Sequence, residues 1–217
     1  MNPFILPPTS EVNKIIPKNA FDIFTNSKEK KQFSEFVNKM IWLNKLSVET
    51  INLGGNEISE IQIFKIELKI KQEIDFLISI IDKVIPYPII FFILYEDEYY
   101  ISTSQKHINP IKQDKTVIDW KFKSEWILCQ DLRFSLNLRK SLDFIFLDFC
   151  NQLVQPCHKI FQSMAELVEY QKALNQINKE IYRIETAIKN CKQFNKKVEL
   201  NLELGKLQSK RKELMNH

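Results

Sequence analysis

The chain has 217 residues and a net charge of +4, a length that suits one domain of about 160 residues followed by a helical tail. Only three glycines occur, at positions 54, 55 and 205, which excludes the glycine-rich phosphate loops of Walker and dinucleotide-binding sites. Acidic and basic residues alternate almost everywhere, so the modest positive charge permits contact with nucleic acid without requiring it.

The cysteines and the apolar segments indicate the cellular compartment in which we expect the chain. The four cysteines have no paired spacing, and the first residues lack the basic and apolar segments of an export signal. The longest apolar run, residues 89–95, is shorter than the roughly 20 residues that cross a bilayer. We therefore expect a cytoplasmic chain with reduced thiols and no insertion into a membrane.

The N-terminal part of the chain predicts helices followed by short strands. Pro17 begins one helical segment, and Ser27 caps a second whose apolar residues keep helical spacing as far as Met40. Short apolar runs at residues 41–46 and 50–53 predict strands.

The middle of the chain predicts a sheet with packed helices. Residues 60–70 alternate apolar and polar side chains as a strand does, and residues 72–85 carry the apolar stripe of an amphipathic helix. Residues 89–94 are apolar on both faces, which predicts a central strand covered above and below. Further strands are expected after a hairpin turn at 96–98, at residues 99–104 and 117–122.

A helix from Leu138 to the residues before Pro156 completes a first domain, residues 1–158. This order of elements predicts an α+β fold, with a mixed sheet of about five or six strands and packed helices.

The end of the chain, residues 159–217, predicts an antiparallel coiled-coil hairpin. Apolar residues recur at spacings of three and four from Leu167 to Cys191, and a shorter leucine seam from Leu200 to Leu214 is interrupted by Arg211. The first helix would be about 40 Å long at about 1.5 Å per residue.

The hairpin either covers only its own domain or binds another protein. We expect it to bind a partner through the seam residues Leu167, Tyr170, Leu174, Ile177, Ile181, Ile184 and Ile188.

One pair of residues suggests catalysis. Glu67 and Lys69 lie two apart on a predicted strand that precedes a helix and a central strand. Nucleases of the PD-(D/E)xK class place such a pair there, with the carboxylate on a divalent metal and the lysine near the attacking water. A second metal-binding Asp is expected from the preceding hairpin, where only Glu57 and Glu60 are near.

Basic residues offer weak candidates for contact with nucleic acid. Lys121 and Lys123 alternate with aromatic residues, a mixture that stacks on single-stranded bases, and Lys210, Arg211 and Lys212 are consecutive. Both patterns also occur on solvated surfaces.

Metal and cofactor sites are not expected. Cys157 and His158, together with Cys150 or His107, are suitable ligand types, but their spacing fits no structural zinc pattern.

Several segments of the sequence together resemble a known family. They are residues 12–18 (VNKIIPK), 42–47 (WLNKLS), 50–53 (TINL), 60–64 (EIQIF), 81–92 (IDKVIPYPIIFF) and 124–126 (SEW). The resemblance is to the bacterial domain-of-unknown-function family 4391 and extends over nearly the whole length. It implies an accessory protein encoded beside DNA methyltransferases and helicase-type translocases in restriction and phage-defence clusters, and it carries over no catalytic residue.

These observations favour a noncatalytic adaptor subunit of a phage-defence or restriction-like DNA-processing complex. Its expected partners are other protein subunits, such as a helicase or translocase or a DNA methyltransferase, with DNA contact and self-association left open. The alternatives are a metal-dependent nuclease that uses Glu67 and Lys69, and a module that binds single-stranded nucleic acid.

Overall fold

The computed structural model describes residues 3–111, 116–154 and 159–216. The chain forms two compact units, Met1–Val154 and Gln155–His217, called here the sheet unit and the hairpin unit. The domain boundary expected between residues 158 and 159 adjoins residues 155–158, which lie outside the described part.

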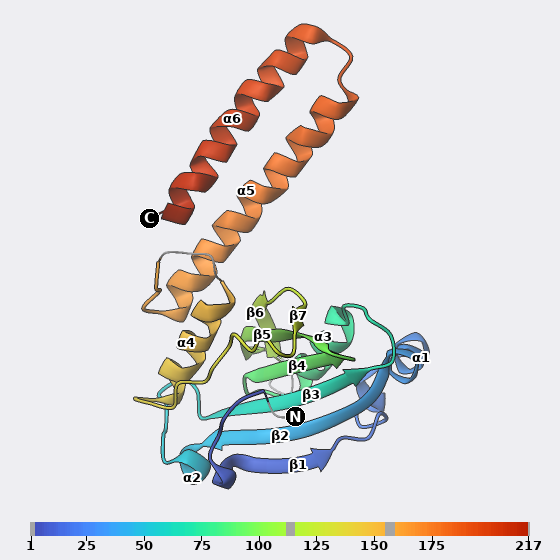
Figure 1. Ribbon diagram of the computed structural model, residues 1–217, viewed down its shortest axis with the longest axis vertical. Helices are drawn as coiled ribbons and strands as arrows, with labels where there is room; N and C mark the ends of the chain where they lie inside the picture. Colours follow the sequence, from blue (N-terminus) through green and yellow to red (C-terminus); the bar gives the residue numbers. More distant parts are fainter. Residues whose placement is uncertain (1–2, 112–115, 155–158, 217) are drawn as a thin grey trace. The chain divides into compact units, whose positions relative to one another are not determined.

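The sheet unit contains one mixed sheet whose strand order follows the sequence, β1-β2-β3-β4-β5-β6, with β7 paired to β5 (Figure 1). Neighbouring strands are antiparallel except β3 and β4, which are parallel. The predicted α+β class with a mixed sheet is confirmed, and the described residues form seven strands. These are β1 (Glu11–Ile15), β2 (Val37–Ser47), β3 (Glu60–Leu68), β4 (Ile89–Tyr95), β5 (Glu98–Ile108), β6 (Thr116–Lys123) and β7 (Ile127–Leu128).

Helices cover the sheet because its central strands are apolar on both faces. On one face, α1 (Ser27–Phe36) and α3 (Asp75–Val84) pack on a core built around Phe64, Ile66 and Phe91. The alternate residues of β4 point to the other face. Helix α4 (Leu142–Leu153), which follows all the strands in the sequence, contacts β3. Three short helices complete the unit: η1 (Pro8–Ser10), η2 (Asp22–Phe24) and α2 (Val48–Ile51).

The central strand was predicted correctly. Residues 89–93 are at most 3 % exposed, and β4 lies between β3 and β5. The turn predicted at 96–98 is a two-residue hairpin turn, because Tyr95 pairs with Glu98 and Glu96 takes a positive φ of 52°.

The helix predicted to reach Met40 ends earlier. Asn26 and Glu29 form a capping box that begins α1, and the helix ends at Phe36. Val37 already has extended backbone and opens β2, which pairs with β3 along its whole length. The apolar spacing of residues 33–40 suits a helix, but pairing with β3 buries Val37 and Met40 in the sheet core instead.

The strand predicted at residues 50–53 is wrong, because Thr50 and Ile51 belong to the single-turn helix α2 and residues 52–53 follow it outside any strand. Thr50 Oγ1 accepts a hydrogen bond from Ser47 N at 2.9 Å and donates one to the carbonyl of Lys45 at 2.8 Å. Asn52 ends the turn in the left-handed region, with φ 54°. These local side-chain bonds favour a turn over a strand.

The loop before β3 is fastened to the start of α4. The Asp143 carboxylate accepts hydrogen bonds from the backbone N–H groups of Asn56, Glu57 and Ile58 at 2.6, 3.1 and 2.8 Å. A Cβ atom at Gly55 would lie 2.3 Å from the Ile58 carbonyl oxygen and 2.9 Å from Asp143 Oδ2. Only glycine therefore fits at this position of the loop.

Helix α3 is tied to β5 by a buried ion pair. Lys106 Nζ donates to Asp82 Oδ1 at 2.7 Å and to the carbonyls of Asp82 and Ile85 at 2.8 and 2.7 Å. Both side chains are fully buried, and Thr116 Oγ1 donates to the same Asp82 carbonyl. Burial lowers the pKa of the Lys106 ammonium, and the Asp82 carboxylate opposes this shift.

Truncation of Phe91 to alanine should reduce the free energy of unfolding by about 3–5 kcal/mol, because a fully buried ring is lost from the centre of the sheet. Chemical denaturation monitored by circular dichroism measures the change. The matched control is Phe76→Ala, since Phe76 is 39 % exposed and should lose much less. Equal losses in both variants would mean that β4 is not central.

Replacement of Lys106 by methionine should destabilise the sheet unit by about 3–5 kcal/mol, because it leaves the Asp82 carboxylate buried without its cation. The double variant Lys106→Met with Asp82→Leu should recover most of this loss, since no buried charge remains. Urea titrations of the unmodified protein, the single variant and the double variant measure the free energies of unfolding that test this. A double variant that is less stable than the single one would contradict the argument.

Candidate functional site: the C-terminal helical hairpin

The hairpin unit consists of α5 (Met164–Asn190) and α6 (Phe194–Asn216), joined by residues 191–193. Figure 1 shows α6 returning antiparallel beside α5, as predicted. Ser163 caps α5 by accepting a hydrogen bond from Glu166 N at 3.3 Å. Glu166 also pairs with Lys159 at 2.8 Å, which places a carboxylate at the positive end of the helix dipole.

The predicted partner-binding seam of α5 is largely buried. Within it, Leu174 and Ile188 are half-buried, and the remaining five residues are buried: Leu167, Tyr170, Ile177, Ile181 and Ile184. Tyr170 also packs against Phe161, with ring centroids 4.8 Å apart. The five buried seam residues stabilise the fold of the chain itself, and the role of the seam in binding a partner stays a prediction.

Helix α6 is apolar on two opposite faces. Its seam leucines at positions 200, 204, 207 and 214 are half-buried, and none of its described side chains between residues 194 and 215 is buried. Phe194, Val198 and Leu202 recur every four residues and are 80 %, 44 % and 65 % exposed. At about 100° per residue, Val198 lies about 200° around the helix from Leu200. We call Phe194, Val198 and Leu202 the outward stripe.

The outward stripe was missed at the level of sequence, although its spacing of four is visible there. The leucine seam alone is enough to predict a helix that packs against α5, so the sequence pattern did not call for a second apolar face. In the sequence, Leu202 lies between the seam residues Leu200 and Leu204, so it does not stand out as part of a separate apolar face.

A groove lies between the two helices, with a volume of about 470 Å³. Its apolar wall is formed by Ala173, Ile177, Leu207 and Leu214, and its polar lining by Gln176, Glu180, Lys210 and Glu213. The groove is on a flank of the hairpin, since its residues adjoin the seam rather than the outward stripe.

Helix α6 is basic, with six lysines and arginines against three glutamates. The predicted nucleic-acid residues at its end have different settings. Lys210 and Lys212 are exposed, whereas Arg211 is half-buried in line with the seam leucines.

The other predicted nucleic-acid residues already have partners within the sheet unit. Lys121 Nζ donates to the Asp75 carbonyl at 3.2 Å and to Ser79 Oγ, and burial lowers its pKa. Lys123 forms ion pairs with Glu73 and Asp75 at 2.7 and 2.8 Å.

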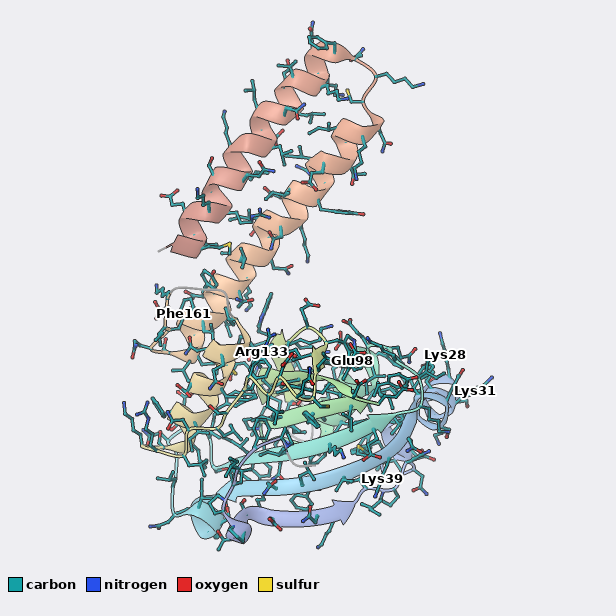
Figure 2. All side chains as sticks on the ribbon, viewed as in Figure 1. Lys28, Lys31, Lys39, Glu98, Arg133 and Phe161 are labelled. Carbon is teal, nitrogen blue, oxygen red and sulfur yellow. The ribbon has the colours of Figure 1, made fainter. Side chains whose placement is uncertain are left out.

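Three of the aromatic residues beside these lysines offer little stacking surface. Tyr99, Tyr100 and Phe122 are at most 2 % exposed, whereas Trp120 and Trp126 are half-buried. Other lysines are more accessible: Lys28 and Lys31 extend from α1 into solvent (Figure 2).

The side chains of Glu67 and Lys69 bind different partners. Glu67 pairs with Lys65 at 2.8 Å on β3, whereas Lys69 lies beyond the end of that strand and donates to the Ser34 carbonyl at 2.8 Å. Glu60, at the opposite end of β3 from Glu67, pairs with Lys45. Within the described residues, no group of three or more His, Cys, Asp or Glu side chains is placed to hold a metal ion.

The residues considered for zinc do not converge where they are described. Cys150 is fully buried in α4, and burial raises the pKa of its thiol well above the usual value. His107 Nδ1 lies 2.9 Å from Asp119 Oδ2 on the neighbouring strand. Cys157 and His158 lie outside the described residues.

In residues 3–111, 116–154 and 159–216, no helix combines the length and the apolar character that a membrane span requires. No curated protein and no solved structure matches the chain. The sequence does match the family described as a domain of unknown function (DUF4391), over residues 4–210. Because this match covers nearly the whole chain, the protein belongs to that family.

Proposed function

We propose that the protein is a noncatalytic accessory subunit of a prokaryotic phage-defence or restriction-like DNA-processing complex in the cytoplasm. It binds a partner protein through the outward stripe of α6. The observation that carries this proposal is the exposure of Phe194, Val198 and Leu202 on a helix whose opposite face is already packed against α5.

The energetic argument rests on apolar area. Burial of a large apolar side chain contributes roughly 1.5–3 kcal/mol relative to exposure, so three adjacent side chains are enough to anchor a contact. Within the hairpin the seam leucines hold α6 on α5, whereas these three side chains are largely exposed. A contiguous exposed apolar stripe is typical of interaction surfaces.

The charge of α6 indicates the chemistry of the partner. Lys196 and Lys197 lie within the first turn beside Phe194, and the helix as a whole has twice as many basic as acidic residues. A complementary surface presents an apolar groove bordered by carboxylates. The resemblance described above favours a helicase-type translocase or a DNA methyltransferase as the subunit that carries it.

The variant Val198→Asp with Leu202→Asp should abolish co-purification with the partner encoded beside the gene, because it places two charges in the apolar contact. It should also abolish restriction of phage in cells. The matched control is Asn178→Asp with Gln208→Asp, which adds the same charge to the hairpin at exposed positions outside the stripe. Unchanged co-purification of the Val198/Leu202 variant would contradict the proposed docking surface.

Glu67→Ala should leave both co-purification and phage restriction intact, because Glu67 pairs with Lys65 and, in the part of the chain that the structure describes, belongs to no group of side chains that could hold a metal ion. Plaque counts on cells that carry the complete gene cluster measure this. If Glu67→Ala removes restriction while the complex still assembles, a metal-dependent nuclease replaces the adaptor as the proposed function.

A further inference from the structure

The turn that follows β1 is packed against α1. Ala20 N donates a hydrogen bond to the Pro17 carbonyl at 3.0 Å, which closes the turn. The ring of Phe21 then stacks on Phe33 of α1, with ring centroids 6.3 Å apart. Lys18 lies within this turn, so its backbone is held beside the helix.

Lys69 follows β3 and lies at the C-terminal end of α1. Its backbone N–H donates to the Phe36 carbonyl at 2.8 Å, and its Nζ donates to the Ser34 carbonyl at 2.8 Å. Both carbonyls belong to the last turn of α1, where the helix dipole places partial negative charge. The end of the helix therefore accounts for one ammonium group.

A second ammonium group lies beside the first. Burial and the charge of Lys69 lower the pKa of Lys18, so the two side chains come close together. No ion pair within the described residues includes either lysine, in contrast to Lys123, which pairs with two carboxylates. Two neighbouring cations repel each other, and an anion bound between them removes that repulsion.

Two further lysines extend the positive charge along α1. Lys28 and Lys31 are about one turn apart and extend into solvent (Figure 2). Lys28 lies six residues, or about 9 Å along the helix axis, from Ser34, whose carbonyl binds Lys69. Phosphates of one strand of a DNA duplex recur about every 3.4 Å along its axis, so these lysines together span several phosphates.

The carboxylates of this part of the chain leave a net positive charge. Asp22 pairs with Lys30 at 3.6 Å, and Glu29 accepts a hydrogen bond at 2.8 Å as part of the capping box of α1. Glu35 is exposed about one turn after Lys31 and opposes the binding of an anion.

We propose that the four residues Lys18, Lys28, Lys31 and Lys69, called here the lysine row, bind the phosphate backbone of a nucleic-acid duplex. Lys18 and Lys69 hold one phosphate between them, and Lys28 and Lys31 contact further phosphates. Lysine binds phosphate as a point charge, so the contact positions the duplex without reading its base sequence. A duplex is favoured over an acidic protein because its charges recur at short, regular intervals, as the lysines do along one helix.

This inference does not rest on the proposed function. The lysine row belongs to the sheet unit, whereas the outward stripe belongs to the hairpin unit, and binding of a duplex is measured without any partner protein. The variant Val198→Asp with Leu202→Asp should bind the duplex as tightly as the unmodified chain does.

The test uses the full-length chain and a fluorescent DNA duplex of about 20 base pairs, with anisotropy measured between about 50 and 200 mM salt. Lys18→Gln with Lys69→Gln should weaken binding by about tenfold or more and make its dependence on salt shallower, because phosphate contacts are lost. The matched control is Lys189→Gln with Lys192→Gln, which removes the same charge from exposed positions of the hairpin unit. It should change the affinity by less than about twofold.

Two variants at exposed positions keep the test independent of folding. Lys28→Gln with Lys31→Gln should weaken binding by about threefold or more, whereas Glu35→Gln should strengthen it by about twofold, because it removes the opposing charge. Circular dichroism checks that each variant keeps its secondary structure.

Three results would overturn the proposal: an unmodified chain that does not bind the duplex, equal losses in the Lys18/Lys69 variant and its control, or a Glu35→Gln variant that binds no more tightly. Competition by poly-glutamate as strong as that by unlabelled duplex would also overturn it, because the surface would then suit an acidic protein.

Discussion

The sheet unit depends on the requirement that β4 be covered on both faces. Residues 89–93 are all apolar and present side chains alternately to the two sides, so a single layer of helices would leave half of them in water. The parallel pairing of β3 and β4 supplies the first cover, because it needs a crossover connection and that connection contains α3. The second cover comes from α4, beyond the last strand.

Three lysines of the β5–β6 hairpin bind polar groups on or beside α3. Lys106, Lys121 and Lys123 reach α3 near its C-terminus, middle and N-terminus, and each donates to a carboxylate, a hydroxyl or a backbone carbonyl. The buried pair of Lys106 and Asp82 adds little net stability but fixes the position of the helix, since any shift leaves a buried charge unpaired. The polar partners of Lys121 and Lys123 leave these two lysines poorly suited to bind phosphate groups.

The features predictable from sequence were those encoded by a strong periodic pattern. The uniform apolar run of β4, the amphipathic stripe of α3 and the heptad spacing of α5 each gave the correct element. Predictions failed where short apolar runs fit two structures, as at residues 37–40, or where side-chain bonds decided, as at Thr50. Five of the seven residues expected to bind a partner are buried in the structure of the single chain, because spacing reveals that a face is apolar but not what covers it. The groove depends on how α6 lies beside α5, which no single helix pattern encodes.

The link between Asp143 and the backbone of residues 56–58 has a consequence for how the protein emerges from the ribosome. The residues it joins are 85 to 87 positions apart, and all strands from β1 to β7 precede α4 in the chain. During synthesis from the N-terminus the sheet can therefore pair before its second cover exists, with an apolar face open to other chains. Until then, the three backbone N–H groups of the loop, whose conformation requires Gly55, lack their acceptor, the Asp143 carboxylate in the first turn of α4. The bonds of Asp143 can therefore form only when α4 has been synthesised and can cover the apolar face of the sheet.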